Sequence, residues 1–254
     1  MRTLIVGDIH GKLNPLIDAL NKIEYDSKHD RLVFIGDFIN GGKQPIEVIT
    51  LLLKIKAEAV YEPIFIKGNH DYWFAELLHR DFALFRDKKY IRKKYKTWMK
   101  KGGDKTYNAY RKADSGLLEL HKTSFFDQLV DYYQWENNLA VHAGFDPNVG
   151  FEKTKRRDPH SLFWDRSLFQ LALKKFGKNN KRTNKFGKRR KPISKFDVVY
   201  IGHTPTIKFN FDTPRIIGNV LNVDQGCKYT GKLTIWDDHN QTYVQGEDVN
   251  PQYS

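Results

Sequence analysis

The sequence has few of the features that mark exported or membrane-embedded proteins. A single cysteine, Cys227, among 254 residues rules out a disulfide within the chain and suits a reducing compartment. The residues before Asp8 are too few for the apolar core of a secretion signal, and no apolar run approaches the ~20 residues that span a membrane. These absences predict a soluble, cytoplasmic protein with no membrane partner. Because no long linker divides the chain, we expect one domain over 1–254.

Acidic residues are scarce relative to basic ones. Lys and Arg number 43 against 30 Asp and Glu, which gives a formal net charge of +13. Such an excess favours a polyanionic substrate or partner. Basic residues concentrate in 86–101 and in 178–191, and the second segment contains no acidic residue. We interpret the first as a helix with a solvated basic side and a buried aromatic side, and the second as part of a flexible loop over about 176–192.

Short apolar runs predict strands in two groups, separated by a helical region. The early strands alternate with helices that begin at Asn14-Pro15 and at Pro45, whereas the late strands follow one another closely. Helical spacing prevails over about 72–135, which we interpret as a cap above the site. The pattern predicts an α/β fold with four α/β/β/α layers, its two sheets face to face between helices. The expected strands are 3–6, 31–35, 63–66, 139–141, 198–201, 216–223 and 233–236.

Five glycine-flanked segments place carboxylate, amide and imidazole groups at the ends of these strands. Glycine lets the backbone turn sharply at a sheet edge, so side chains distant in sequence can converge. One such segment alone says little, because a lone histidine at a strand end is usually an ordinary hydrogen-bonded residue. Five together predict a dinuclear site for Mn, Fe, Zn or Ni, since these metals accept mixed oxygen and imidazole ligands. The segments are GDIHG (7–11), GDFINGG (36–42), GNHD (68–71), VHAG (141–144) and IGHT (201–204).

In their order, these segments resemble the motifs of the phosphoprotein phosphatase branch of the calcineurin-like metallophosphoesterases. That branch carries GDxHG, GDxxDRG, GNHE or GNHD, a later HG or HAG, and GHT, and the resemblance spans almost the whole chain. It implies two divalent transition metal ions, Mn²⁺ foremost, whose bridging hydroxide attacks phosphorus directly. It also implies that Asp37 bridges both metals, with Asp8 and His10 on one and Asn69, His142 and His203 on the other.

The resemblance further implies the roles of two residues outside the metal set. His70 would protonate the leaving oxygen, because an imidazole has a pKa near neutrality. Arg166, in the FWDR segment (163–166), would grip two phosphate oxygens with its guanidinium. The VDQGC segment (223–227) resembles an Asp-Thr-Gly-Cys stretch near the C-terminus of family members, and we interpret it as a structural turn.

The second motif departs from the family at two positions. Asn40 stands where the family has the aspartate that supports the general-acid histidine, and Gly41 where it has a phosphate-binding arginine. Asn40 is expected to orient His70 through its amide oxygen, but without negative charge the pKa of His70 should be lower. Asp71 is an alternative support for His70. General acid assistance is worth roughly 10²- to 10⁴-fold, so substrates with good leaving groups should be favoured.

The leading hypothesis is a metal-dependent phosphomonoesterase of the serine/threonine protein phosphatase type, acting on a phosphorylated protein or a small phosphorylated molecule. A dinucleoside polyphosphate hydrolase is the alternative among enzymes, since that sister group shares these motifs and has also lost the aspartate of the second one. A third hypothesis is a nuclease or nucleic-acid-binding protein that uses the basic segments 86–101 and 178–191, whose aromatic residues could stack on bases.

Overall fold

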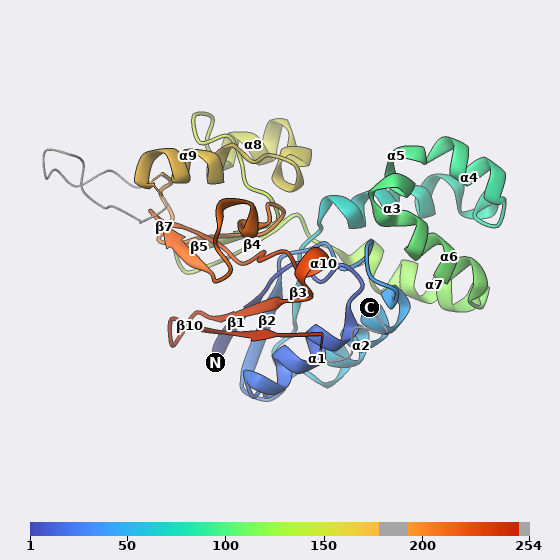
Figure 1. Cartoon of the computed structure of the whole chain (residues 1–254), viewed down its shortest axis with the longest axis horizontal. Helices are drawn as coiled ribbons and strands as arrows, with labels where there is room; N and C mark the ends of the chain where they lie inside the picture. Colours follow the sequence, from blue (N-terminus) through green and yellow to red (C-terminus); the bar gives the residue numbers. More distant parts are fainter. Residues whose placement is uncertain (178–192, 249–254) are drawn as a thin grey trace, which may run out of the picture.

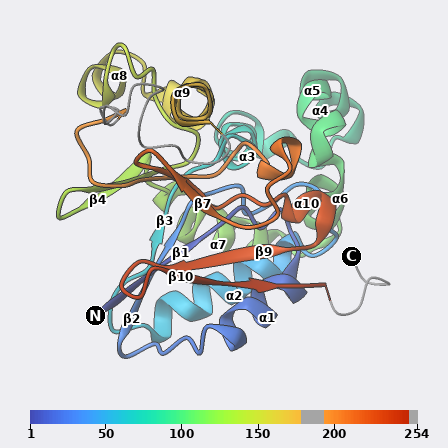
Figure 2. The same cartoon turned by 60° about the vertical axis from the view of Figure 1, so that its left-hand side comes forward.

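The protein is described here by a computed structural model covering residues 1–177 and 193–248. Figures 1 and 2 show two sheets packed between layers of helices, with further helices extending to one side. This architecture confirms the predicted four-layer α/β/β/α fold. The first sheet has the strand order β10-β9-β1-β2-β3. Its strands are β1 (Arg2–Val6), β2 (Asp30–Phe34), β3 (Ile64–Phe65), β9 (Leu233–Asp237) and β10 (Thr242–Gly246).

The second sheet has the order β4-β5-β6-β8-β7. Parallel pairing of β5, β6 and β8 makes their carboxyl ends meet at one edge, as those of β1, β2 and β3 do in the first sheet. Chain segments that follow these strands are thereby brought together between the sheets. The strands are β4 (Tyr132–Trp135), β5 (Asn138–Val141), β6 (Val199–Ile201), β7 (Arg215–Ile217) and β8 (Val220–Asn222).

Helices cover the outer faces of both sheets, and a separate group leads away from the first sheet (Figure 1). The first sheet is covered by α1 (Leu13–Lys22) and α2 (Pro45–Glu58), and the second by α8 (Phe151–Arg157) and α9 (Ser167–Phe176), while α10 (Cys227–Thr230) precedes β9. The separate group consists of α3 (Asn69–Asp81), α4 (Lys88–Lys94), α5 (Lys96–Trp98), α6 (Asp104–Lys112) and α7 (Ser115–Ser124).

Alternation along the strands divides the apolar side chains into three clusters. In β1, Leu4 and Val6 belong to the cluster beneath the helices, whereas Ile5 points to the opposite face. In β5, Leu139 likewise belongs to the cluster beneath the helices of the second sheet, and Ala140 belongs to the cluster between the sheets. Successive strand residues face opposite sides, so each sheet buries both faces. The cluster between the sheets consists of Ile5, Val33, Ile35, Ile66, Ala140, Tyr200, Leu221, Val223 and Trp236.

Three local details differ from the sequence-based prediction. Residues 132–135, expected at the end of the helical region, form β4, because their backbone pairs with β5 in an antiparallel hairpin. The expected strand 216–223 is two strands, since Gly218, with φ of +69°, lies at the tight turn between β7 and β8. Asn14 does not cap α1; its amide donates to the Asp248 carboxylate, and Lys12 occupies the capping position.

The basic segment 86–101 has its aromatic residues packed against the protein, as expected. Trp98 is buried, and the hydroxyls of Tyr90 and Tyr95 both donate to the Asp81 carboxylate. The Trp98 ring is therefore enclosed in the helical group, and the half-buried Tyr90 and Tyr95 are tied to it through Asp81. The other basic segment, 178–191, and most of the expected loop over 176–192 lie outside the described residues. Nucleic-acid binding stays a prediction.

None of the helices in residues 1–177 and 193–248 combines the length and the apolar character that crossing a membrane requires.

The helical group is organised around one phenylalanine of α3. Phe74 is fully buried and packs against four aromatic rings, with centroid separations of 5.0 to 6.2 Å. These rings come from four separate segments of the helical group, so Phe74 connects α3 with the rest of the group. Its partners are Phe85, Trp98, Tyr110 and Phe126.

Truncating this side chain should destabilise the protein strongly. Phe74→Ala should lower the free energy of unfolding by about 3–5 kcal/mol, because the cavity left among rigid rings cannot collapse fully. Chemical denaturation followed by tryptophan fluorescence measures the change. Leu84→Ala, at an exposed apolar residue of the same group, is the matched control and should stay within about 0.5 kcal/mol of the parent. An equal loss in both variants would contradict the assigned role of Phe74.

Candidate metal centre

The five glycine-flanked segments converge at the carboxyl edges of the two sheets. Four of their residues adopt left-handed backbone conformations, which cost free energy in non-glycine residues and tend to occur at functional sites. Neighbouring glycines relieve crowding, since a Cβ at Gly68 would lie 2.2 Å from Asp37 Oδ1, and one at Gly202 2.1 Å from Asp8 Oδ1. The four strained residues are His10 (φ 54°), Asp37 (φ 54°), Asn40 (φ 72°) and His203 (φ 65°).

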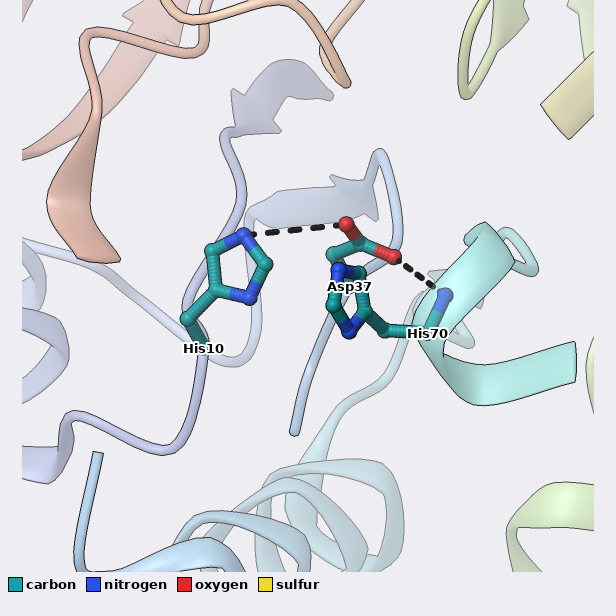
Figure 3. Close-up of side chains that lie close together, drawn as sticks. All are labelled: His10, Asp37 and His70. Carbon is teal, nitrogen blue, oxygen red and sulfur yellow. Dashed lines mark hydrogen bonds and ion pairs between the residues drawn. The ribbon is translucent and has the colours of Figure 1, made fainter. Parts of the chain in front are cut away.

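The carboxylate of Asp37 lies at the centre of the site (Figure 3). Its Oδ2 is 3.6 Å from Nε2 of His10, and its Oδ1 is 3.5 Å from Nε2 of His142. Oδ1 also accepts a hydrogen bond of 2.9 Å from the backbone N–H of His70. Each oxygen therefore faces a different imidazole, which is the arrangement a bridging carboxylate requires.

Two groups of potential ligand atoms share Asp37. One is formed by His10, Asp37 and His70 and the other by Asp37, His142 and His203, and within each group the atoms lie within 4.8 Å of one another. Asp8 belongs to neither group. Its Oδ2 accepts from the backbone N–H of His203, and its buried Oδ1 has no hydrogen-bond partner among the described residues.

The tautomers of two histidines follow from their backbone partners. Nδ1 of His10 is 2.9 Å from the carbonyl of Asn40, and Nδ1 of His142 is 2.8 Å from the carbonyl of Ile35. A carbonyl can only accept, so Nδ1 carries the proton and Nε2 presents a lone pair toward Asp37. Backbone carbonyls commonly orient metal-binding imidazoles in this way.

Acceptors around Nε2 of His142 face one another without a donor between them. The side-chain oxygen of Asn69 lies 3.3 Å from Nε2 of His142, and it lies 2.9 Å from Nδ1 of His203, which can donate to it or accept according to the tautomer. Because Nε2 of His142 has no proton, it shares this space with two oxygens, those of Asn69 and Asp37, which can only accept. Converging lone pairs repel each other unless a cation lies between them, and the residues therefore fit a metal ion.

Burial favours the neutral forms of both the carboxyl and the imidazole groups of the site. Burial, reinforced by the charges of Asp224 and Asp37, raises the pKa of Asp8 well above its usual value. Burial lowers the pKa of His10 to about 4 and that of His142 to about 3. Neutral imidazoles can bind a metal, and a bound divalent cation would stabilise the ionised form of the buried carboxylates.

Asp71, the alternative support predicted for His70, instead binds backbone amides. Its carboxylate accepts hydrogen bonds from the backbone amides of Asp37 (2.7 Å), Phe38 (3.0 Å) and Gly68 (2.9 Å). It therefore fixes the loop that carries Asp37 against the start of α3, and it does not support the His70 ring.

His70 is contacted by Asn40, but through the amide nitrogen and not the expected oxygen. Nδ2 of Asn40 lies 3.1 Å from Nδ1 of His70 and also donates to the His70 carbonyl at 3.3 Å. The second bond requires a donor, so the nitrogen faces the ring and Nδ1 of His70 accepts. The neutral ring then carries its proton on Nε2. Burial, followed by the charges of His10 and Lys228, lowers the pKa of His70 far below its usual value.

Arg166 lies at the rim of the site, at the start of α9. Its side chain is exposed, and within residues 1–177 and 193–248 the structure shows no ion pair for it. Its positive charge lowers the pKa of Asp37, which follows a strand of the first sheet, and of His142 and His203, which follow strands of the second. The segment 223–227 is the structural turn that was expected, since the Gln225 amide bonds to Asn222 and Thr206.

Sequence reasoning missed three residues beside the site. Trp73 and Trp164 pack edge to face at 4.9 Å, and their rings border His70 at 5.4 Å and His203 at 6.3 Å. Lys228, half-buried on α10, acts electrostatically on Asp37 and His70. Only adjacency to motifs could have signalled these residues, since Trp73 and Lys228 each follow a recognised segment closely.

Comparison with known proteins identifies the family. The model of the calcineurin-like phosphoesterase family matches residues 1–206. The chain belongs to the calcineurin-like phosphoesterase family. As a member it is a metallophosphoesterase, an enzyme that hydrolyses phosphoric esters with the help of metal ions.

Relatives of this phosphoesterase include named tetraphosphatases. The asymmetrical bis(5'-nucleosyl)-tetraphosphatase of Oceanobacillus iheyensis is 26% identical over 93% of this chain and 88% of its own length. The symmetrical bis(5'-nucleosyl)-tetraphosphatase of Coxiella burnetii is 28% identical over 66% of this chain, but over only 53% of its own length. The chain thus spans about half of the symmetrical relative.

Solved structures share the fold at low sequence identity. A protein assigned as a diadenosine tetraphosphatase superposes with a TM-score of 0.61 at 17% identity, covering 98% of this chain and 95% of its own. A protein serine/threonine phosphatase from Saccharomyces cerevisiae gives 0.59 at 16% identity, covering 98% and 81%. Both hydrolase types therefore use this fold, which alone does not separate them.

Replacing the central carboxylate tests the metal centre. Asp37→Asn should weaken Mn²⁺ binding at least about 100-fold, because it removes the charge shared by both groups of ligand atoms, and even supporting residues are worth 10–100-fold. Metal content after gel filtration, measured by atomic emission, reports the loss. Asp26→Asn, at an exposed carboxylate before the amino end of β2 and thus away from the carboxyl edge that carries the site, is the control. Undiminished metal content in Asp37→Asn would contradict the bridging position.

Proposed function

We propose that the protein hydrolyses phosphoanhydride bonds of dinucleoside polyphosphates, the class to which diadenosine tetraphosphate belongs. Two named relatives with this activity support this alternative over the serine/threonine protein phosphatase hypothesis. The proposal includes two divalent transition metal ions, with Mn²⁺ as the first candidate. Their ligands would be Asp8 and His10 for one, Asn69, His142 and His203 for the other, and Asp37 for both.

The side chains of the protein prepare the site for this chemistry. When bound, two divalent cations activate water as a nucleophile and neutralise phosphate oxygens. Asp37 holds one oxygen toward each sheet's imidazole, and the carbonyls of Asn40 and Ile35 keep the two imidazoles in the tautomer that binds metal. Arg166 at the rim is free to bind a phosphate oxygen with two parallel hydrogen bonds.

The contact between Asn40 and His70 is the observation on which the proposed substrate class depends. A histidine acts as a general acid in its imidazolium form, in which both ring nitrogens carry a proton. A hydrogen-bond acceptor beside Nδ1 would favour that form. Asn40 offers a donor there, so it opposes the imidazolium form. His70 then serves as a hydrogen-bond donor to the substrate through Nε2–H and not as an acid.

Loss of acid catalysis matters little for an anhydride and much for an alkyl ester. A nucleotide departs as a phosphate anion whose conjugate acid is far stronger than an alcohol, and it needs no proton as it leaves. The alkoxide of phosphoserine does need one. The geometry at Asn40 therefore favours phosphoanhydrides over phosphorylated serine or threonine.

Two tryptophans supply a surface for the nucleoside. Trp73 and Trp164 are half-buried, and their rings adjoin those of His70 and His203. Stacking of a base on an aromatic ring is worth about 1–3 kcal/mol and tolerates every base. We infer that this pair, called here the tryptophan pair, binds the base of the nucleotide next to the cleaved bond.

Restoring the carboxylate should change the substrate preference. With Mn²⁺, the parent should release nucleotides from diadenosine tetraphosphate and act poorly on a phosphoserine peptide. Asn40→Asp should raise the rate on the peptide by about 10²-fold or more, since Asp accepts from Nδ1 and stabilises imidazolium, while the tetraphosphate rate changes little. Chromatography of nucleotides and phosphate release measure both. Parent activity on the peptide without tetraphosphate cleavage would overturn the proposal, as would equal gains on both substrates.

Removing one ring of the tryptophan pair should weaken nucleoside binding alone. Trp73→Ala should raise the KM for diadenosine tetraphosphate about tenfold, while the inhibition constant of inorganic tripolyphosphate, which has no base, stays within about twofold. Tyr243→Ala, at an exposed aromatic residue on edge strand β10, is the control and should change neither. Parallel weakening of both ligands in Trp73→Ala would show general damage to the site and would contradict base stacking.

A further inference from the structure

We propose that Lys228 binds a phosphate oxygen of the substrate, as a second cationic contact beside the metal centre. The inference rests on the proposed phosphoesterase site but not on the identity of the nucleoside. Arg166 approaches the site from α9, whereas Lys228 approaches from α10, which follows the second sheet and precedes β9. The two cations come from different elements.

The helix that carries Lys228 is held rigidly against the metal centre. It begins after Gly226, whose φ is +83°, and the amide of Gly226 donates to Asp224 Oδ1 at 2.8 Å. Cys227, the next residue, is buried with its thiol 3.7 Å from the carbonyl of Ile9, between Asp8 and His10. The backbone of Lys228 is therefore fixed relative to the first metal-binding loop.

The ammonium of Lys228 lies within electrostatic range of the central residues but is not neutralised by an ion pair of its own. The side chain of Lys228 lies beside Gly41, and the backbone amide of the next residue, Gly42, donates to the carbonyl of His10 at 2.6 Å. The structure shows no salt bridge for Lys228 within residues 1–177 and 193–248. A cation held near metal ligands in this way becomes available to an anion once the carboxylates are engaged by metal.

The ammonium also has spare hydrogen-bonding capacity. It donates to the carbonyl of Lys101 at 2.8 Å, which is its one hydrogen bond in the part of the chain that the structure describes. An ammonium has three N–H donors. Two donors therefore remain for a ligand or for water.

The side chain of Lys228 occupies the space beside Gly41. A Cβ at Gly41 would lie 3.1 Å from Cγ and 3.2 Å from Cε of Lys228, and Gly41 has φ of +130°. A side chain at position 41, where the family motif has its arginine, would thus compete with Lys228 for space. In this chain, a cation from α10 fills the place next to the second motif that a side chain at position 41 would take.

Other lysines gather at the same place. The ammonium of Lys105 donates to the carbonyl of Gly41, and Lys101 supplies the carbonyl that holds Lys228. Burial lowers the pKa of Lys228, and the charges of Lys101 and Lys105 lower it further, while Asp37 opposes them. Mutual repulsion among these cations is relieved when a polyanion binds between them. A polyphosphate chain, which extends beyond the reacting phosphorus, has the required charge.

The test measures phosphate binding to the Mn²⁺-loaded protein by titration calorimetry, with inorganic phosphate and tripolyphosphate as probes. Lys228→Met keeps the aliphatic part that packs on Gly41 and removes the charge. It should weaken binding of both probes about tenfold or more, as expected for a charge-assisted hydrogen bond. Lys228→Arg should remain within about threefold. Lys232→Met, at a lysine on the following loop that pairs with Glu247, should bind as the parent does.

Melting temperature without phosphate separates this role from a structural one. If Lys228 only ties α10 to the carbonyl of Lys101, Lys228→Met melts lower and binds phosphate with parental affinity, which overturns the proposal. Should Lys228→Met fail to fold, Lys228→Gln answers the same question. The outcome does not depend on tetraphosphate cleavage: Lys228-dependent phosphate binding in a protein that leaves diadenosine tetraphosphate intact refutes the proposed substrate and keeps the inference.

Discussion

One buried carboxylate, that of Asp37, joins the two sheets at the site. Its oxygens face His10 from the first sheet and His142 from the second, while one of them also accepts the backbone amide of His70. Its own backbone is equally engaged, since its amide donates to Asp71 and its carbonyl accepts from His10. Every segment that supplies a ligand is thus positioned directly or indirectly by this residue.

This arrangement sacrifices stability for binding capacity. Left-handed backbone at non-glycine residues and uncompensated lone pairs both disfavour the folded chain, and the surrounding core must offset them. The three apolar clusters described above supply that compensation, because the sheets bury both of their faces. A metal ion that binds only the folded form adds further stability in proportion to its affinity.

Much of the fold and of the ligand set could be predicted because both depend on local signals. Apolar runs that end in glycine gave the strand ends, and parallel pairing brings such ends together whatever lies between them. The direction of the Asn40 amide, the task of Asp71 and the place of Lys228 were beyond reach, because each depends on contacts with segments distant in sequence. The hairpin of β7 and β8 was missed because Gly218 is embedded in an apolar run.

The position of β1 within its sheet has a consequence for the kinetics of folding. It pairs with both β2 and β9, and the amide of Gly7 bonds to the carbonyl of Thr234. Because β1 and β9 are far apart in the sequence, their pairing closes a long loop, which costs conformational entropy and slows folding. The loop with Asp8 and His10 gains this anchor only when that long-range pairing forms.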